Sequence, residues 1–296
     1  MDNEPSKTKL FLPTVVEDPA LRCGSCEGCG CRPSLPPLSF TKLTGPTLNI
    51  EEDKAFETSQ PCINIRAFGH KLYLCRNGGT IEVFNYDLKP MHKWSNADEW
   101  GDVNDVTELP GQQIAVAGSK GLFVVSAGGR TISTLERGPS FCSCAAVEGR
   151  LVACSNSQRQ LLQYGLSGSE WKRMPMIREQ MPWVKLAVAD RNTIICGCSN
   201  PDKIIEVTKD SKLRERRALG REGHRYLLCA ADAKGAILVI DKRNGDLKVC
   251  DSIGGWHMFG PHARAKSPQS AVVIKNRLCV ASDGGDRLLL YTSTTE

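Results

Sequence analysis

Four cysteines in the run CGSCEGCGC are the densest group of potential metal ligands in the chain: Cys23, Cys26, Cys29 and Cys31. Cysteines separated by two residues can hold zinc because a tight turn brings both thiolates to one metal ion. Structural zinc sites, however, place a longer loop between their two cysteine pairs, and here the next histidine is His70. The four cysteines are therefore candidate metal ligands, but we expect a mobile segment with exposed thiols and no cofactor.

Aromatic and cationic residues are interspersed in several turn-rich segments of the second half of the chain. Between residues 171 and 225, 13 Lys and Arg face seven Asp and Glu, and KLRERRALGREGHR (Lys212–Arg225) is the most basic run. Aromatic side chains beside cations can anchor an acidic peptide, or stack nucleobases and hold phosphates. A solvated edge strand, its charge diluted by Glu215 and Glu222, is the alternative interpretation. The predicted partner-binding residues are Trp183, Arg221, His224, Arg225, Trp256, His262, Arg264 and Lys266.

Outside the cysteine run, the sequence carries no recognisable catalytic or metal-binding motif. The acidic stretch DEWGDVND (Asp98–Asp105) lacks the alternating Asp-x-Asp-x-Asp-Gly order of a calcium loop. No Gly-x-Ser-x-Gly elbow, His-Glu-x-x-His helix, phosphate-binding glycine loop or kinase signature occurs, and the five histidines are scattered. Asn64, Asn104, Asp105 and Asn276 have the chemistry of axial metal ligands, but the sequence pattern assigns them to no shared position. We therefore expect no enzymatic activity.

The elements that must carry these residues are six copies of one pattern. Each copy is an apolar β-type run, a turn of Gly, Asn, Ser or Asp, and a second β-type run, as in KLYLCRNGGTIEVF from Lys71. The first branched aliphatic residues of the copies are 42, 37, 43, 43 and 41 residues apart, close to the roughly 40–50 residues of a four-stranded propeller blade. These first residues are Leu72, Ile114, Leu151, Ile194, Ile237 and Leu278. The chain is predicted to be an all-β, six-bladed β-propeller.

The third copy shows how a blade divides into strands. It predicts an inner strand at Phe141–Val147, then strands at Arg150–Ser155 and Gln160–Leu166, and an outer strand at Trp171–Met176. The two innermost runs are almost continuously apolar, as expected when neighbouring blades cover both faces. The loops that lead from an outer strand to the next inner strand then lie on one face of the ring. Trp100 and Arg178 are predicted in these loops together with most of the partner-binding residues.

The last copy has no outer strand of its own. Leu43–Ile50 (LTGPTLNI) is a β-type run that belongs to no blade, so we expect it to supply the missing strand and to remove an open sheet edge. Residues 1–38 are predicted to be a disordered Cys- and Pro-rich tail and residues 39–296 the propeller, most simply a monomer.

The compartment is predicted from what the chain lacks. No signal-peptide design and no membrane-spanning run is present, so a cytoplasmic or nuclear location is expected. Most other cysteines fall inside apolar strand patterns and are expected to be buried and reduced: Cys75, Cys154, Cys196, Cys198, Cys229, Cys250 and Cys279.

Residues 40–296 resemble the NHL family of six-bladed propellers, which many TRIM-like proteins carry at their carboxyl end. The nearest local match is DAKGAILVIDKRNGDLKVCD (Asp232–Asp251), which is similar to the family's order of Asp, Gly, apolar strand, Asp, Asn and apolar strand. The other copies keep the strands and lose most of these polar residues. No RING motif is present, so ubiquitin-ligase activity does not carry over from the resemblance.

The sequence favours a non-catalytic adaptor or scaffold that presents one loop face to a protein or peptide partner. Single-stranded RNA binding, which some NHL-type propellers perform on a basic face, is the first alternative. A metal-dependent hydrolase of the lactonase type is the second.

Overall fold

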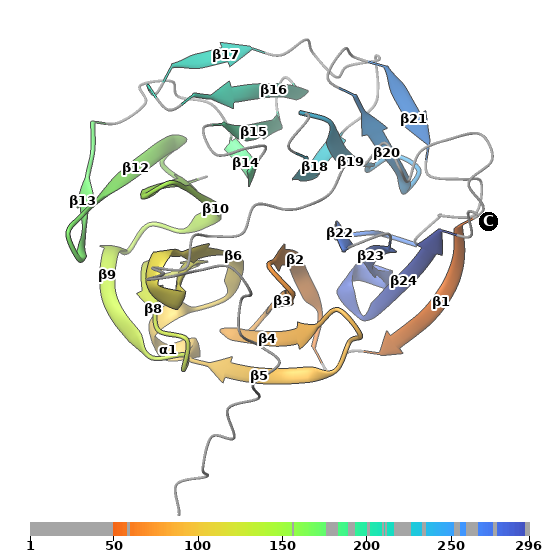
Figure 1. The fold of residues 1–296 in the computed structure, drawn as a ribbon, viewed down its shortest axis with the longest axis horizontal. Helices are drawn as coiled ribbons and strands as arrows, with labels where there is room; N and C mark the ends of the chain where they lie inside the picture. Colours follow the sequence, from red (N-terminus) through yellow and green to blue (C-terminus); the bar gives the residue numbers. More distant parts are fainter. Residues whose placement is uncertain are drawn as a thin grey trace, which may run out of the picture. The chain divides into compact units, whose positions relative to one another are not determined.

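Six four-stranded antiparallel sheets are arranged in a ring around a central axis (Figure 1). The computed structural model describes residues 50–57, 60–155, 157–175, 183–188, 193–199, 202–208, 210, 212–215, 226–232, 235–251, 255–258, 266–274 and 277–293. Each sheet is one blade, with one of its two edge strands nearest the axis. The all-β, six-bladed propeller predicted from the repeats is confirmed.

Blades 1 to 3 follow each other along the chain, each with its strands in sequence order. One short helix, α1 (Ala97–Trp100), connects blade 1 to blade 2. The strands are β2 (Cys62–Phe68), β3 (Lys71–Arg76), β4 (Thr80–Asn85) and β5 (Pro90–Ser95) in blade 1; β6 (Val103–Leu109), β7 (Gln113–Gly118), β8 (Gly121–Val125) and β9 (Thr131–Arg137) in blade 2; and β10 (Phe141–Val147), β11 (Arg150–Ser155), β12 (Gln160–Ser167) and β13 (Glu170–Arg173) in blade 3.

Blades 4 to 6 continue the ring, and the last blade takes its outer strand from the other end of the chain. The strands are β14 (Trp183–Val188), β15 (Ile194–Ser199), β16 (Asp202–Val207) and β17 (Leu213–Glu215) in blade 4; β18 (Tyr226–Ala231), β19 (Ile237–Asp241), β20 (Asp246–Cys250) and β21 (Trp256–Met258) in blade 5; and β22 (Ser270–Ile274), β23 (Arg277–Ser282), β24 (Arg287–Ser293) and β1 (Ile50–Glu57) in blade 6.

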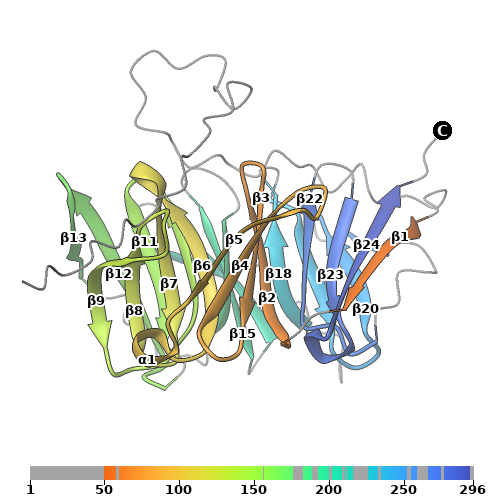
Figure 2. The same cartoon turned by 90° about the horizontal axis from the view of Figure 1, so that it is seen from below.

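The ring closes through antiparallel pairing of β1 with β24, from Ile50 opposite Ser293 to Glu57 opposite Arg287 (Figure 2). Closure by an amino-terminal strand is therefore confirmed, but the strand is Ile50–Glu57, and only Ile50 belongs to the predicted segment. An outer strand needs few apolar residues, so the charged run IEEDKAFE serves where the sequence analysis chose the more apolar LTGPTLNI. Residues 43–49 lie outside the described part of the chain.

The core consists of apolar clusters that pack between neighbouring blades. One of them joins blade 3 to blade 4 through residues such as Val152, Leu161 and Ile205. The predicted burial of cysteines is confirmed at Cys75, Cys154, Cys196, Cys229, Cys250 and Cys279; the Cys198 side chain lies outside the described set. Burial raises the pKa of the Cys229 thiol to about 11 and that of the Cys279 thiol to about 12, so both stay protonated at neutral pH.

Helices contribute little to the described part of the chain. None of the helices found there is long and apolar enough to cross a membrane.

Candidate functional site

The third residue of the inner strand is polar in four of the six blades. In β2, β6, β10 and β14 the pairing register shifts immediately before this residue. Such a β-bulge turns the following side chain away from the regular strand direction. The bulges thus bring to one axial level four residues that lie some 40 positions apart in the chain: Asn64, Asp105, Ser143 and Lys185. Ser270, the first residue of β22, reaches the same level and contacts Asn64.

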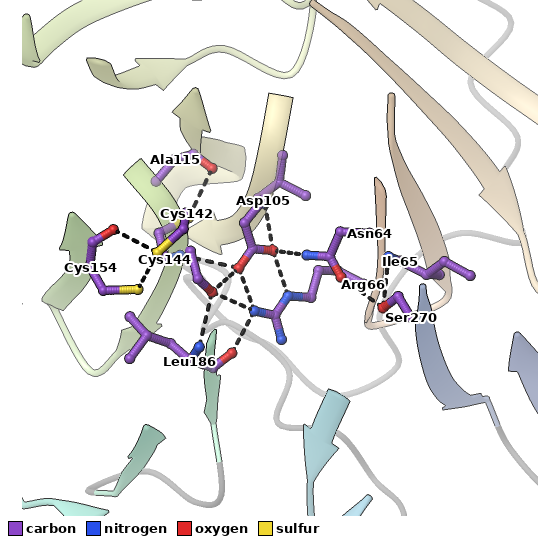
Figure 3. A network of polar contacts seen from close by, with 12 residues as sticks. Asn64, Ile65, Arg66, Asp105, Ala115, Cys142, Cys144, Cys154, Leu186 and Ser270 are labelled. Carbon is purple, nitrogen blue, oxygen red and sulfur yellow. Dashed lines mark hydrogen bonds and ion pairs between the residues drawn. The ribbon is translucent and has the colours of Figure 1, made fainter. Parts of the chain in front are cut away.

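Asp105 is the centre of this axial polar network, and its carboxylate accepts six hydrogen bonds (Figure 3). Oδ1 accepts from Asn64 Nδ2 at 2.5 Å, Arg66 Nε at 2.7 Å and the Val106 backbone N–H at 2.9 Å. Oδ2 accepts from Arg66 Nη2 at 2.5 Å, from the Ser143 hydroxyl and from the Cys144 backbone N–H at 3.1 Å. A buried carboxylate with this many donors has no lone pair left for another ligand.

Arg66 extends the network to further blades. Its Nη2 also donates to Ser143 Oγ at 3.1 Å and to the Leu186 carbonyl of blade 4 at 2.5 Å. On the other side, Ser270 of blade 6 donates through its hydroxyl to Asn64 Oδ1 at 2.8 Å. Side chains from four blades and a backbone carbonyl from blade 4 therefore take part in the network, and the axis is fixed by polar contacts between blades.

The charges in this network perturb one another. Burial alone would raise the pKa of Asp105, but the positive charges of Arg66 and Lys185 and the hydrogen bonds hold it below its ordinary value. Burial lowers the pKa of Lys185, and the nearby Arg66 charge lowers it further against the attraction of Asp105. Two cationic side chains thus surround one carboxylate at the axis.

A small cavity lies on the axis beside this network. Its volume is about 50 Å³, and its wall comes from the inner strands of all six blades. We call it the axial cup and define it by its lining residues, Arg66–Phe68, Thr107, Cys144, Ala145, Ala187, Val188, Cys229–Ala231, Val272 and Val273. Among them Arg66 is the one charged residue, so the cup joins a single cation to an apolar wall.

The structure brings together two residues that the sequence analysis left without a shared position. Asn64 and Asp105 are hydrogen-bonded, while Asn104 turns away and donates to the Phe141 carbonyl at 2.7 Å. Asn276 lies outside the described residues. Among the residues that the structure does describe, no cluster of three His, Cys, Asp or Glu is found.

An exposed aromatic pair lies on blade 5. Trp256, the first residue of β21, is 36 % exposed and stacks on Tyr226 with 5.1 Å between ring centroids. The Lys248 ammonium lies 5.6 Å from the centre of the Tyr226 ring and pairs with Asp241 at 2.7 Å. Stacking on Tyr226 therefore holds the partly exposed Trp256 ring in a fixed orientation.

The other predicted partner-binding residues are only partly described. Trp183 begins β14 rather than standing in a loop, and Lys266 is exposed, with its carbonyl accepting from Ser282 Oγ at 3.0 Å. Arg178, Arg221, His224, Arg225, His262 and Arg264 lie outside the described residues, as do Cys23, Cys26, Cys29 and Cys31 and the tail, residues 1–38.

Trp100 corrects the predicted loop face. It ends α1, is fully buried and donates from Nε1 to Thr131 Oγ1 at 3.1 Å, so it is a packing residue between blades 1 and 2. Arg66, in contrast, was missed as a site residue. Its signal was a charged side chain in the middle of the mostly apolar strand run CINIRAF, which is rare unless the charge is paired.

Comparisons with known proteins identify the fold and no family. No family model matches the chain, and no curated protein sequence matches it significantly. Among solved structures, virginiamycin B lyase from Staphylococcus aureus is 10 % identical over 83 % of this chain and 99 % of that one, with a TM-score of 0.62. The Cps50 (Swd1) β-propeller domain of Myceliophteria thermophila is 8 % identical over 84 % and 100 %, also at 0.62. The Neurospora crassa Pan2 WD40 domain is 9 % identical over 86 % and 98 %, at 0.58.

The chain is a β-propeller. At these identities the likeness extends to the fold alone, since propellers with unrelated activities share it.

Proposed function

We propose that this propeller is a non-catalytic binding module that presents Trp256 and its surroundings to a protein or peptide partner. The exposed, stacked Trp256 is the observation that carries the proposal. Tryptophan is the residue type most enriched among those that dominate binding energy, and here stacking on Tyr226 has already reduced its freedom. The NHL-type kinship and the cytoplasmic or nuclear location are predictions that accompany this proposal.

The axial carboxylate supports a binding role over a hydrolytic one. A metal on the axis would need oxygen ligands with free lone pairs, and both oxygens of Asp105 are already engaged with donors from three blades. The Arg66 guanidinium also holds this carboxylate in an ion pair. Asp105 therefore stabilises the contacts between blades, and we expect the protein or peptide partner to bind on the outer surface.

The test is affinity capture with the full chain and two matched variants. Trp256→Ala removes the exposed indole on blade 5, and Ile132→Ala removes another exposed apolar side chain, 54 % exposed, on blade 2. We expect a set of proteins, quantified by mass spectrometry after ribonuclease treatment, that Trp256→Ala loses and Ile132→Ala keeps. Equal losses from both variants, or none from either, would contradict the proposal.

A salt series separates the protein partner from RNA. Fluorescence anisotropy of the full chain with a random single-stranded RNA pool measures the alternative directly. RNA binding that weakens steeply with salt, and that Trp256→Ala reduces, would favour base stacking on this surface in place of a protein partner.

A further inference from the structure

The axial cup contains a hydrogen-bond donor that none of the described residues accepts from. Arg66 donates to Asp105 from Nε and Nη2, and Nη2 also reaches Ser143 and Leu186. No hydrogen bond from Nη1 to any described residue is present, and Figure 3 shows this nitrogen projecting away from Asp105 toward the middle of the ring. The Arg66 side chain is only 9 % exposed, so a buried guanidinium edge with two N–H groups lines the cup.

The local charge balance calls for an anion. Arg66 and Lys185 are both more than nine-tenths buried, and Asp105 is the carboxylate that pairs with Arg66. The six donors around Asp105 leave it no capacity to accept from Nη1. An uncompensated buried positive charge is costly, and a bound anion relieves that cost.

The cup's size and wall restrict the anion. About 50 Å³ is room for a few solvent-sized groups and far below the 300–1,000 Å³ of a pocket for a drug-sized ligand. Much of the remaining wall is aliphatic, from Ala187, Ala230, Ala231 and Val272. Among the lining residues, Arg66 and Thr107 are the two whose side chains carry N–H or O–H donors, enough for two carboxylate oxygens. A phosphate would leave further charged oxygens against hydrocarbon.

We propose that the axial cup binds a small monocarboxylate, with its oxygens on Arg66 Nη1 and the Thr107 hydroxyl and its short aliphatic part against the alanines and valines of blades 4 to 6. A free short-chain carboxylate and an acidic side chain inserted by a peptide offer the same chemistry. Only binding of a peptide's acidic side chain rests on the function proposed above.

The test titrates the full chain with sodium acetate and sodium propionate, using sodium chloride at equal ionic strength and acetamide as controls. Isothermal calorimetry and saturation-transfer NMR report binding directly, and the thermal transition should rise with ligand concentration. We expect saturable binding of both carboxylates and none of acetamide. Absence of carboxylate binding, or an equal response to chloride or to inorganic phosphate, would overturn the proposal.

Two variants locate the site. Arg66→Lys removes the Nη1 edge but disturbs the network, so Ala230→Leu is the decisive change: it fills the cup from its apolar wall and leaves every network residue in place. Ala127→Leu, at an exposed turn of blade 2, is the matched control. Acetate affinity should fall at least tenfold in Ala230→Leu and stay unchanged in Ala127→Leu; retained affinity in Ala230→Leu would refute the site.

The two sources are distinguished with N-acetylglutamate N-methylamide and its glutamine counterpart. A peptide source predicts that the glutamate compound displaces acetate while the glutamine compound does not. If only acetate and propionate bind, the site is for a free carboxylate. Failure of all carboxylates leaves the Trp256 capture result untouched, so the two proposals fail separately.

Discussion

The two sides of the central axis use equivalent backbone positions in opposite ways. On the side of blades 1 to 4, the third residues of the inner strands are Asn64, Asp105, Ser143 and Lys185, and hydrogen bonds run from blade to blade. Blade 5 has Leu228 at this position, and it packs into an apolar cluster with residues of blade 4. One backbone ring is thus held by polar links on one side and largely by apolar packing on the other.

The two sides therefore differ in what sets the position of a blade: hydrogen bonds between side chains on one side, and apolar packing on the other. A polar link between blades fixes their relative position because it works only with correct geometry, whereas apolar contacts tolerate small shifts. The polar side is therefore expected to be the rigid side of the axis and the more sensitive to substitution.

The largest effect is expected at Asp105. Asp105→Asn keeps the shape of the side chain but leaves the Arg66 cation buried without its partner, which should cost about 3–5 kcal/mol of unfolding free energy. Leu228→Met, a volume-conserving change at the equivalent position of blade 5, should cost less than about 1.5 kcal/mol. Urea denaturation measures both, and equal losses would remove the distinction between the two sides.

The pH dependence of the stability difference between wild type and Asp105→Asn identifies the electrostatic origin of that difference. The folded-state pKa of Asp105 is depressed, so its contribution is present in full above the unfolded pKa near ~3.9 and is lost as pH falls through the folded value. The difference between wild type and Asp105→Asn should accordingly shrink below about pH 4. A stability difference that stayed constant down to acid pH would show that Asp105→Asn acts through packing and not through charge.

Blade 6 depends on its borrowed strand. Deleting residues 1–57 removes β1 and exposes the edge of β24, and we expect a loss on the order of 10 °C in the thermal transition, with aggregation. Deleting residues 1–38 should leave the transition nearly unchanged. Calorimetry of the two truncated chains compares them, and equal stability would show that β1 does not hold the apolar side closed.

A smaller effect of opposite sign is expected at Lys185. Lys185→Met replaces a buried cation by an apolar side chain and should stabilise the protein by about 1 kcal/mol at pH 7. The folded-state pKa of Lys185 is depressed, so the wild type gains stability as pH rises toward the unfolded value near ~10.4, and the advantage of the variant should narrow there. Lys172→Met, at an exposed position of β13, is the control and should change stability by less than about 0.5 kcal/mol at either pH.

The smallest effect is expected at an ion pair on the rim. Arg173 Nη1 lies 2.8 Å from Glu136 Oε1, but the Arg173 side chain is about half exposed. Glu136→Gln should therefore cost less than about 1 kcal/mol, far below the loss at the buried pair of Asp105. Thermal denaturation at low and high salt measures it; a loss comparable to that of Asp105→Asn would contradict the contrast between centre and rim.

Sequence reasoning predicted the blades more completely than the centre. The strands predicted at Phe141–Val147 and Arg150–Ser155 coincide with β10 and β11, because apolar runs between turn residues are a local signal. Asn64 and Asp105 were noted for their chemistry, but their hydrogen bond joins residues 41 positions apart, and it exists only once the ring has brought two inner strands together. Aligning the inner strands on their third residue would have revealed the polar level.

Contacts made only in the folded ring also explain why Trp100 and the closing strand differ from their predicted places. Trp100 was expected in a loop because it stands among acidic and turn residues, yet the short helix α1 turns its indole into the contact between blades 1 and 2. The closing strand was placed too early because its charged sequence carries little β signal, and pairing with β24 supplies what local preference does not.

Pairing of Ile50 with Ser293 brings the first and last positions of the ring to the same end of one ladder. A pull that separates these two points therefore loads the β1–β24 pairs one after another, as in a zipper, rather than all at once in shear. The ring is then mechanically weakest at the junction that completes it, and a tether on either flank could open blade 6 while the polar links of blades 1 to 4 remain in place.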